Sequence, residues 1–206
     1  MFNRLCKIIF VRHGATCYSE ENRLYDSEDY PPLNELGKEE TQKVIKWLNV
    51  VCPDIDSIYT SSSLRSIQSA RMIAKSCKLD FEILDNLHER QAGIWGGLTY
   101  GQIQEKYPDS FAEYKKNPSE FTLQGAESRI DINKRVGKTI DELIIANTYK
   151  TILVVTHSGV IQSAISYALK IDPIHQDKIY IPTGSTTQIS YFNNWASLVY
   201  SGHVPL

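Results

Sequence analysis

The chain has 206 residues, of which 42% are apolar and 22% are charged, and its formal net charge is −2. This composition is that of a globular protein, and the length predicts a single domain, residues 1–206, with a substantial core. A net charge this small excludes a general electrostatic attraction to nucleic acid, so any anion site must be a local cluster of positive side chains.

The predicted elements alternate between strands and helices along the chain. Residues 7–11 are a short, β-branched apolar run that predicts a buried strand, and residues 151–155 are continuously apolar, as in a central strand covered on both faces. The other predicted strands are 56–60, 81–84, 186–192 and 197–200. The predicted helices are 39–48, 64–77, 99–107, 109–116, 128–146 and 160–169. This order predicts an α/β fold, a three-layer α/β/α sandwich with helices on both faces of a mostly parallel central sheet.

Two of the predicted strands end at a histidine. Arg12 and His13 follow the strand 7–11, and His157 follows the strand 151–155. The carboxyl ends of parallel strands meet at one edge of a sheet, where ligands bind, so we expect the two histidines to lie there together. Arginine offers a planar fork of donors to an anion, and histidine can act as a nucleophile or an acid–base group near neutral pH.

Two further charged residues are expected at the same edge. Arg65 falls in the first turn of the helix after the strand 56–60, and Glu89 follows the strand 81–84. Taken singly, such residues are more commonly structural or solvated than functional. Their predicted convergence on one edge of the sheet favours a site that binds phosphate.

These positions resemble the motifs of a known family. Arg12-His13-Gly14 resembles the RHG signature of the histidine phosphatase superfamily, also called the phosphoglycerate mutase-like family. The resemblance continues in order through the segments 32–37, 61–70, 87–89, 125–128 and 156–159, which span nearly the whole chain. RHG alone would be a weak signal, whereas several motifs in sequence, each in its expected structural context, are specific. The resemblance implies a phosphoglycerate mutase-like fold.

The resemblance also implies a role for each residue. It makes His13 the nucleophile, Glu89 the acid and His157 the second catalytic histidine, with Arg12 and Arg65 binding the phosphate. In the mechanism that follows, the neutral ring of His13 attacks phosphorus to give a phosphohistidine, while a backbone carbonyl holds its other N–H. Glu89 protonates the leaving alkoxide and later deprotonates the attacking water. No metal and no other cofactor are expected, because the guanidinium groups supply the positive charge.

Three hydroxyl side chains are candidates for further substrate contacts. They are Thr16, Ser19 and Ser158. The family often has Glu where Ala15 stands and Asn where Ser19 stands, and that Asn commonly touches phosphate. We therefore expect Ser19 to contact phosphate less well, or through a water molecule.

The expected activity is hydrolysis of the phosphomonoester of a small phosphorylated metabolite. The chain is compact, whereas mutases of this family tend to be longer, and the segments 99–108 and 125–128 resemble those of its smaller phosphatases. A cofactor-dependent phosphoglycerate mutase and a non-catalytic phosphoester-binding module stay open as alternatives. A serine hydrolase is disfavoured because the G-x-S-x-G spacing fails around Ser158, and a zinc protease because His88-Glu89 lacks the second histidine of H-E-x-x-H.

The surroundings of the site are predicted less closely. We expect a helical insertion at about 99–127, together with the loops 22–32 and 100–124, to roof the site and decide the substrate. Candidates for binding a second anionic group of that substrate are Arg90, Lys106, Lys115 and Lys116. The leaving group and the oligomeric state, a homodimer included, stay open.

The cysteines and the N-terminus bear on the location of the protein. Four cysteines occur, and they form neither a CxxC pair nor a metal-ligand spacing with histidine. Lys7 interrupts the N-terminal apolar stretch, which is therefore not typical of a signal peptide, and no apolar run approaches membrane-spanning length. We expect a cytoplasmic protein with reduced thiols, and neither nucleic acid nor a membrane as a partner.

Overall fold

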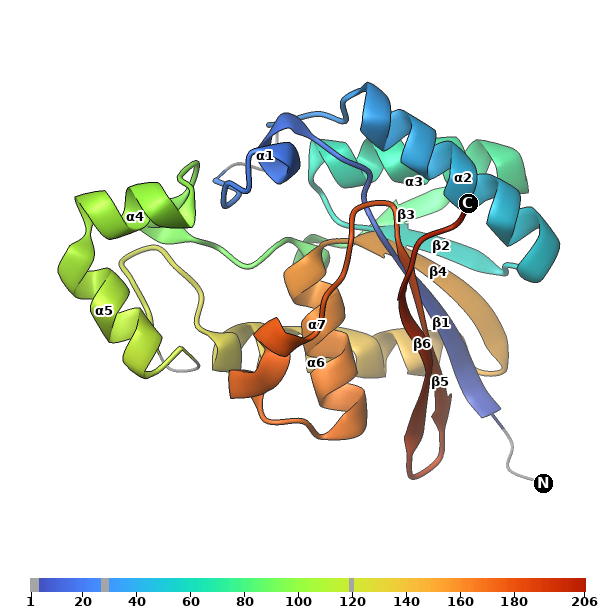
Figure 1. The fold of residues 1–206 in the computed structure, drawn as a ribbon. Helices are drawn as coiled ribbons and strands as arrows, with labels where there is room; N and C mark the ends of the chain where they lie inside the picture. Colours follow the sequence, from blue (N-terminus) through green and yellow to red (C-terminus); the bar gives the residue numbers. More distant parts are fainter. Residues whose placement is uncertain (1–3, 27–29, 119–120) are drawn as a thin grey trace.

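A sheet of six strands forms the centre of the part of the chain that the structure, a computed structural model, describes: residues 4–26, 30–118 and 121–206. Its order is β3-β2-β4-β1-β5-β6 (Figure 1). The parallel strands are β1 (Arg4–Arg12), β2 (Ser57–Thr60), β3 (Phe81–Ile83) and β4 (Lys150–Thr156). The antiparallel strands are β5 (Thr186–Phe192) and β6 (Ala196–His203). The predicted α/β fold with a mostly parallel sheet is confirmed.

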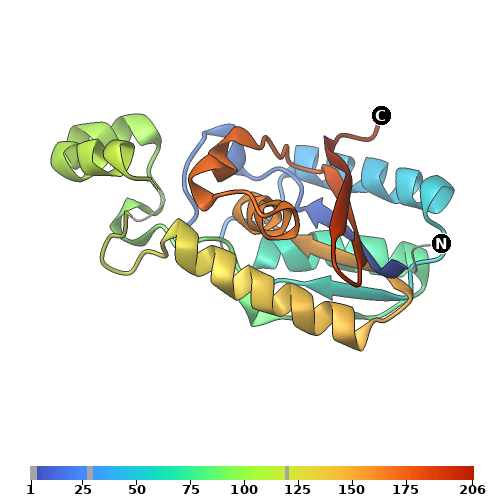
Figure 2. The same cartoon turned by 90° about the horizontal axis from the view of Figure 1, so that it is seen from below.

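Helices cover both faces of this sheet (Figures 1 and 2). One face carries α2 (Glu35–Val51) and α3 (Leu64–Cys77), and the other carries α6 (Arg129–Ala146) and α7 (Ser158–Leu169). Side chains alternate across β1, so Ile9 and Val11 pack toward α2 and α3, while Ile8 and Phe10 pack toward α6 and α7. Each of these fully buried side chains contributes about 1.5–3 kcal/mol to stability. Continuous apolar runs are therefore what the central strands require.

Capping residues set where several helices begin. The α2 helix starts four residues before the predicted 39, because the Asn34 side chain accepts a hydrogen bond from the Gly37 amide at 2.8 Å. Thr99 and Ser128 are N-caps, so the helices predicted from these residues begin one residue later. The short α1 (Cys17–Glu20), capped by Thr16, lies in a segment for which no helix is predicted. Four residues are too few to show an apolar period.

A separate group of aromatic residues holds a lobe at one side of the molecule. The lobe contains α4 (Tyr100–Lys106) and α5 (Pro108–Lys116), which stand apart from the sheet in Figures 1 and 2. Trp95 stacks on Phe121 with ring centroids 5.2 Å apart, and its edge meets Tyr114 at 5.5 Å. The two helices lie within residues 99–127, where a helical insertion is expected, and its role as a roof of the site stays a prediction.

Within the described residues, three short 3₁₀ helices connect the larger elements. They are η1 (Asp85–Leu87), η2 (Gly93–Trp95) and η3 (Pro173–Lys178). Residues 27–29 and 119–120 of the loops expected to roof the site lie outside the described residues. Across the three described ranges, no helix combines the length and apolar character needed to cross a membrane.

Candidate active site

The rings of His13 and His157 lie side by side at the carboxyl edge of the sheet. Strands β1 and β4 are parallel neighbours with Arg12 opposite Thr156, and the His13 amide donates to the Thr156 carbonyl at 2.9 Å. The two ring centroids are 5.1 Å apart, and both residues are fully buried. The register of two central strands thus brings together residues that are far apart in the sequence.

The His13 ring presents an unprotonated nitrogen. Its Nδ1 lies 2.8 Å from the Gly14 carbonyl oxygen, which can only accept, so Nδ1 carries the proton and donates. Its Nε2 is buried and has no partner among the described residues. A backbone carbonyl therefore holds the other N–H, as the sequence analysis expects, and the free lone pair is on Nε2.

Two guanidinium groups flank the histidines. Arg12 donates from Nη1 to the Ile181 carbonyl at 2.6 Å, while its buried Nε has no partner among the described residues. Arg65, in the first turn of α3, is fully buried, and its guanidinium carbon lies 4.0 Å from the centroid of the Tyr25 ring. Arg65 is buried and Arg12 is half-buried, so both cations attract an anion strongly, because little solvent screens them.

Burial and these cations keep both histidines neutral. Burial lowers the pKa of His13 well below 6.5, and the charges of Arg65 and Arg12 lower it further. Burial also lowers the pKa of His157 well below 6.5. The charge of Arg65 and then the neighbouring His13 lower this pKa further. A neutral ring with a free nitrogen is the form that a nucleophilic histidine needs.

Tyr25 is a site residue that sequence reasoning missed. Its ring meets the edge of His13 at 5.5 Å, and its hydroxyl lies 2.9 Å from the Thr16 hydroxyl. It lies within the loop 22–32 expected to roof the site, but no motif or spacing marks it. Its ring lies against the Arg65 guanidinium, and this cation–π contact is visible only in the folded chain.

The Glu89 carboxylate is held by the N-terminus of α7. Its Oε2 accepts from the Ser158 hydroxyl at 3.2 Å and from the Gly159 amide at 3.3 Å, and its Oε1 accepts from the Arg90 amide at 2.8 Å. The partial positive charge at this helix N-terminus therefore stabilises the carboxylate. Glu89 and Arg12 line the same cavity, which has a volume of about 330 Å³.

The three predicted hydroxyl contacts have partners within the protein. Thr16 caps α1 and contacts Tyr25, and Ser158 donates to Glu89. Ser19 accepts from the Thr16 amide at 2.8 Å and donates to the Thr16 carbonyl at 2.9 Å, and it lines the cavity. Contact of these three residues with phosphate stays a prediction.

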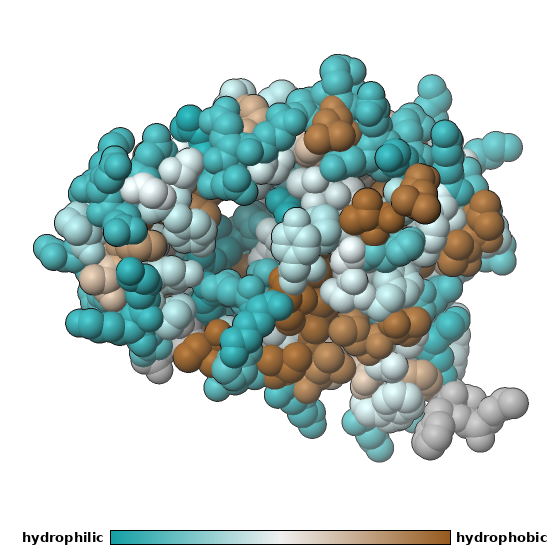
Figure 3. All heavy atoms as spheres, viewed as in Figure 1, coloured by the Kyte–Doolittle hydropathy of each residue, from teal (hydrophilic) through white to brown (hydrophobic). Residues whose placement is uncertain are grey.

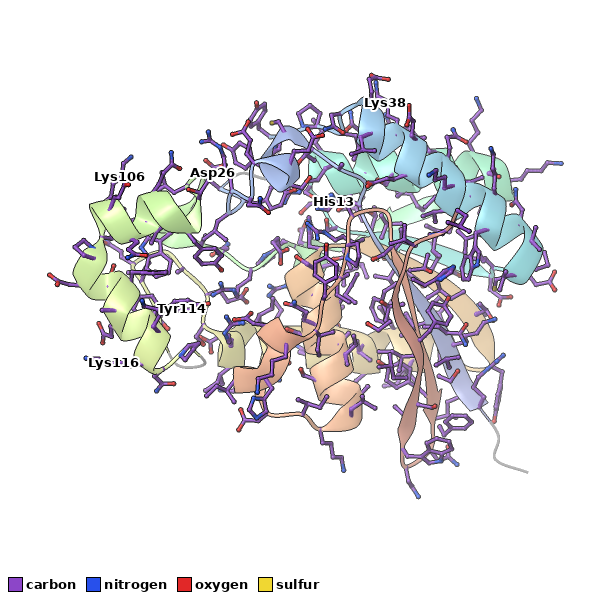
Figure 4. The ribbon with its side chains drawn as sticks, viewed as in Figure 1. His13, Asp26, Lys38, Lys106, Tyr114 and Lys116 are labelled. Carbon is purple, nitrogen blue, oxygen red and sulfur yellow. The ribbon has the colours of Figure 1, made fainter. Side chains whose placement is uncertain are left out.

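The cavity opens between the lobe and the body of the molecule, where a hollow is visible in Figure 3. Arg90 and Tyr100 line it, so the start of α4 reaches the site. The three candidate lysines are exposed on α4 and α5 and do not line it; Figure 4 shows Lys106 and Lys116 on the lobe and His13 near the centre. A larger cavity of about 890 Å³, beside α6, α7 and the β5–β6 hairpin, contains none of the predicted site residues.

The fold and the site together define a class of protein. It is an α/β protein whose sheet edge carries two neutral buried histidines, two guanidinium groups and a nearby carboxylate, which suits the transfer of a phosphoryl group. The sequence model of the histidine phosphatase superfamily (branch 1) matches residues 8–202. The chain therefore belongs to this superfamily.

Individual relatives agree with this assignment. The chain is 27% identical over 168 residues to Phosphoserine phosphatase 1 of Hydrogenobacter thermophilus, which covers 82% of this chain and 78% of that protein. It is 28% identical over 193 residues to the Bifunctional protein Rv2228c of Mycobacterium tuberculosis, covering 94% of this chain but 52% of that protein. The structure of the Alpha-ribazole Phosphatase from Shigella flexneri matches with a TM-score of 0.86 and 20% identity over 97% of this chain and 98% of that one. The phosphoglycerate mutase-like fold is confirmed.

Proposed function

We propose that this protein hydrolyses phosphomonoesters of small phosphorylated metabolites through a phosphohistidine on His13, without a metal ion. The observation that carries the proposal is the buried Nε2 of His13, which no described residue contacts by a hydrogen bond, in a neutral ring beside Arg12 and His157. Membership of the superfamily and the similarity to a phosphoserine phosphatase support the small phosphorylated substrate.

The residues divide the reaction between them. Arg12 and Arg65 neutralise the phosphoryl oxygens and His157 donates a hydrogen bond to one of them. The His13 Nε2 attacks phosphorus, forming an N–P bond as the P–O bond to the leaving group breaks. Glu89 gives its proton to the departing oxygen and then takes one from the water that hydrolyses the phosphohistidine, which restores both groups.

The location of the protein is proposed on separate grounds. All four cysteines are free thiols in the structure. Free thiols persist in reducing compartments, which supports a cytoplasmic location.

The experiment that tests the function is hydrolysis of para-nitrophenyl phosphate in the presence of EDTA. We expect turnover to persist, a phosphoenzyme to be trapped by acid-free rapid quench, and His13→Ala to lose nearly all of both signals. His203→Ala is the matched control, because His203 is an exposed histidine packed on Trp47 outside the site. Loss of turnover with EDTA, or full turnover by His13→Ala, would overturn the proposal.

A second assay separates hydrolysis from the mutase alternative. The enzyme is incubated with 3-phosphoglycerate, with and without 2,3-bisphosphoglycerate. We expect release of inorganic phosphate to exceed isomerisation. Isomerisation faster than phosphate release would make the protein a mutase.

A further inference from the structure

Three buried serines surround one nitrogen of His157. The hydroxyl oxygens of Ser61, Ser63 and Ser66 lie 2.8, 3.1 and 3.5 Å from its Nε2. Each serine is fully buried, and the Ser61 and Ser63 hydroxyls are 3.0 Å apart. The mechanism above uses none of these hydroxyls. Burying a hydroxyl without a hydrogen bond lowers the stability of the folded protein, so their burial needs an explanation.

The other nitrogen of His157 has different surroundings. Its Nδ1 is buried and has no partner among the described residues. The ring lies beside that of His13, whose Nε2 is also unpartnered in the part of the chain that the structure covers. The two nitrogens of His157 therefore have different tasks: Nε2 meets the serines, and Nδ1 is left for a bound group.

The position of one proton decides what His157 can do. A neutral imidazole carries a proton on one nitrogen only, and a serine hydroxyl can either donate or accept. If a serine donates to Nε2, the proton is on Nδ1 and His157 donates to an oxyanion. If Nε2 carries the proton, the Nδ1 lone pair faces the oxyanion and repels it. The ring does not carry a proton on both nitrogens, because burial and the neighbouring guanidinium groups favour its neutral form.

We propose that the Ser61 hydroxyl, the nearest of the three, donates to Nε2 of His157 while Ser63 donates to Ser61, with Ser66 behind them. This arrangement keeps the proton of His157 on Nδ1, where it is given as a hydrogen bond to the bound oxyanion. They are positioning residues, since they act through His157. This inference rests on the proposed function only in taking that oxyanion to be the transferred phosphoryl group. It explains why three hydroxyls are buried at the start of α3.

The direct test is nuclear magnetic resonance of the protein labelled with nitrogen-15 in histidine, with orthovanadate bound. Two-bond proton–nitrogen correlations distinguish the two neutral tautomers. We expect the His157 ring to carry its proton on Nδ1 in the wild-type protein, and to show a mixture of tautomers in the double variant Ser61→Ala/Ser63→Ala. A wild-type ring protonated on Nε2 with vanadate bound would overturn the inference, whether or not any variant folds.

Kinetics provide the second test. We expect Ser61→Ala/Ser63→Ala to lower kcat/KM for para-nitrophenyl phosphate and to weaken inhibition by vanadate, each by about tenfold, which is the size of one buried hydrogen bond. Ser63→Thr keeps the hydroxyl, so its kcat/KM should stay closer to that of the wild type than the kcat/KM of Ser63→Ala. The control is Ser163→Ala, because Ser163 is a buried serine of α7 whose hydroxyl has no partner among the described residues. Equal loss in Ser63→Ala and Ser63→Thr would contradict a role for the hydroxyl.

The two proposals can fail separately. If His157 is protonated on Nδ1 with vanadate bound but the protein does not hydrolyse phosphomonoesters, the proposed function is wrong and the inference about the serines is supported. If the protein hydrolyses phosphomonoesters through a phosphohistidine but His157 is protonated on Nε2, the proposed function is supported and the inference about the serines is wrong.

Discussion

Gly159 lies so close to Glu89 that a Cβ atom at residue 159 would be 2.4 Å from the carboxylate oxygen Oε1. The Gly159 amide meanwhile donates to Oε2 at 3.3 Å. A glycine at the second residue of α7 therefore lets the helix N-terminus and the carboxylate approach each other closely. The position of the proposed acid depends on this absence of a side chain.

We expect Gly159→Ala to lower kcat by about 10- to 100-fold, because a catalytic group displaced by about 1 Å can cost a factor of about 100. The clash is with the end of a flexible side chain, so the melting temperature should fall by no more than about 3 °C. Steady-state kinetics and thermal unfolding measure the two effects. Gly101→Ala is the control, since its Cβ would meet only the Thr99 hydroxyl, at 3.8 Å. Unchanged kcat in Gly159→Ala would contradict a catalytic carboxylate at this place.

If Glu89 donates a proton, the loss of rate on replacing it should depend on the leaving group of the substrate. Glu89→Gln should lower the rate by about 10²- to 10⁴-fold for an alkyl phosphate, whose alkoxide needs a proton. The loss should be much smaller for para-nitrophenyl phosphate, because nitrophenolate leaves without one. Phosphate release from both substrates is compared in Glu89→Gln and in Glu82→Gln, whose exposed carboxylate lies on β3. The same loss on both substrates would argue against proton transfer by Glu89.

Arg90 is the candidate for binding a second anionic group of the substrate. It lines the cavity, and among the described residues its side chain donates to the Glu127 carbonyl alone, at 3.4 Å. The Glu127 carboxylate is already bound by Arg135 at 2.8 and 2.7 Å, so it does not neutralise Arg90.

We therefore expect Arg90→Ala to raise KM about tenfold for phosphoserine and 3-phosphoglycerate, which carry a carboxylate, and to change KM less for para-nitrophenyl phosphate. The measurement is KM for the three substrates. Lys116→Ala, which removes an exposed cation from the lobe, is the control. If Arg90→Ala raises KM equally for all three substrates, the residue does not distinguish a second anionic group.

The two buried histidines predict how stability depends on pH. Both have pKa values well below 6.5 in the folded protein, and both return to about 6.5 in the unfolded chain. As the pH falls below about 6.5, the unfolded chain binds protons that the folded chain does not. The free energy of unfolding must therefore decrease, by up to about 1.4 kcal/mol per pH unit for each histidine, until the pH reaches the folded pKa values.

Urea unfolding at about pH 7.5 and about pH 5.5 measures this loss. We expect the double variant His13→Gln/His157→Gln to lose less stability between these pH values than the wild type. His203→Gln should lose as much as the wild type, because His203 is exposed. An equal loss in the double variant and the wild type would show that these rings do not stay neutral in the folded protein.

The sequence predicted the fold well where burial leaves few choices. A continuously apolar run such as 151–155 has to be a covered strand, and β4 extends it by one residue at each end. Element bounds were predicted less closely where a cap decides them, as at Asn34, since capping depends on one side chain and not on a period. The lobe was expected as two helices, and its aromatic packing on Trp95 became visible only in three dimensions.

Some residues of the candidate site could be found from the sequence, and others only from the structure. His13 and His157 could be found from the sequence because both follow a strong strand signal and carry a motif. Tyr25 could not, since a tyrosine in a loop has no pattern and its contacts with Arg65 and His13 form only in the folded chain. Ser158 was expected on phosphate, and only the structure shows its hydroxyl on Glu89.

The sequence by itself determined which residues stand at the ends of the central strands, because apolar runs must be buried and polar motifs follow where they stop. Tertiary structure alone decided which nitrogen of His157 is left for a bound group, because serines nearly a hundred residues away hold the other one. The carbonyl that holds His13, in contrast, belongs to the next residue in the chain. A ring nitrogen beside a carbonyl carries the proton, whereas one that accepts from a hydroxyl does not, and the contacts of His157 with the serines form only after β2 and β4 have paired.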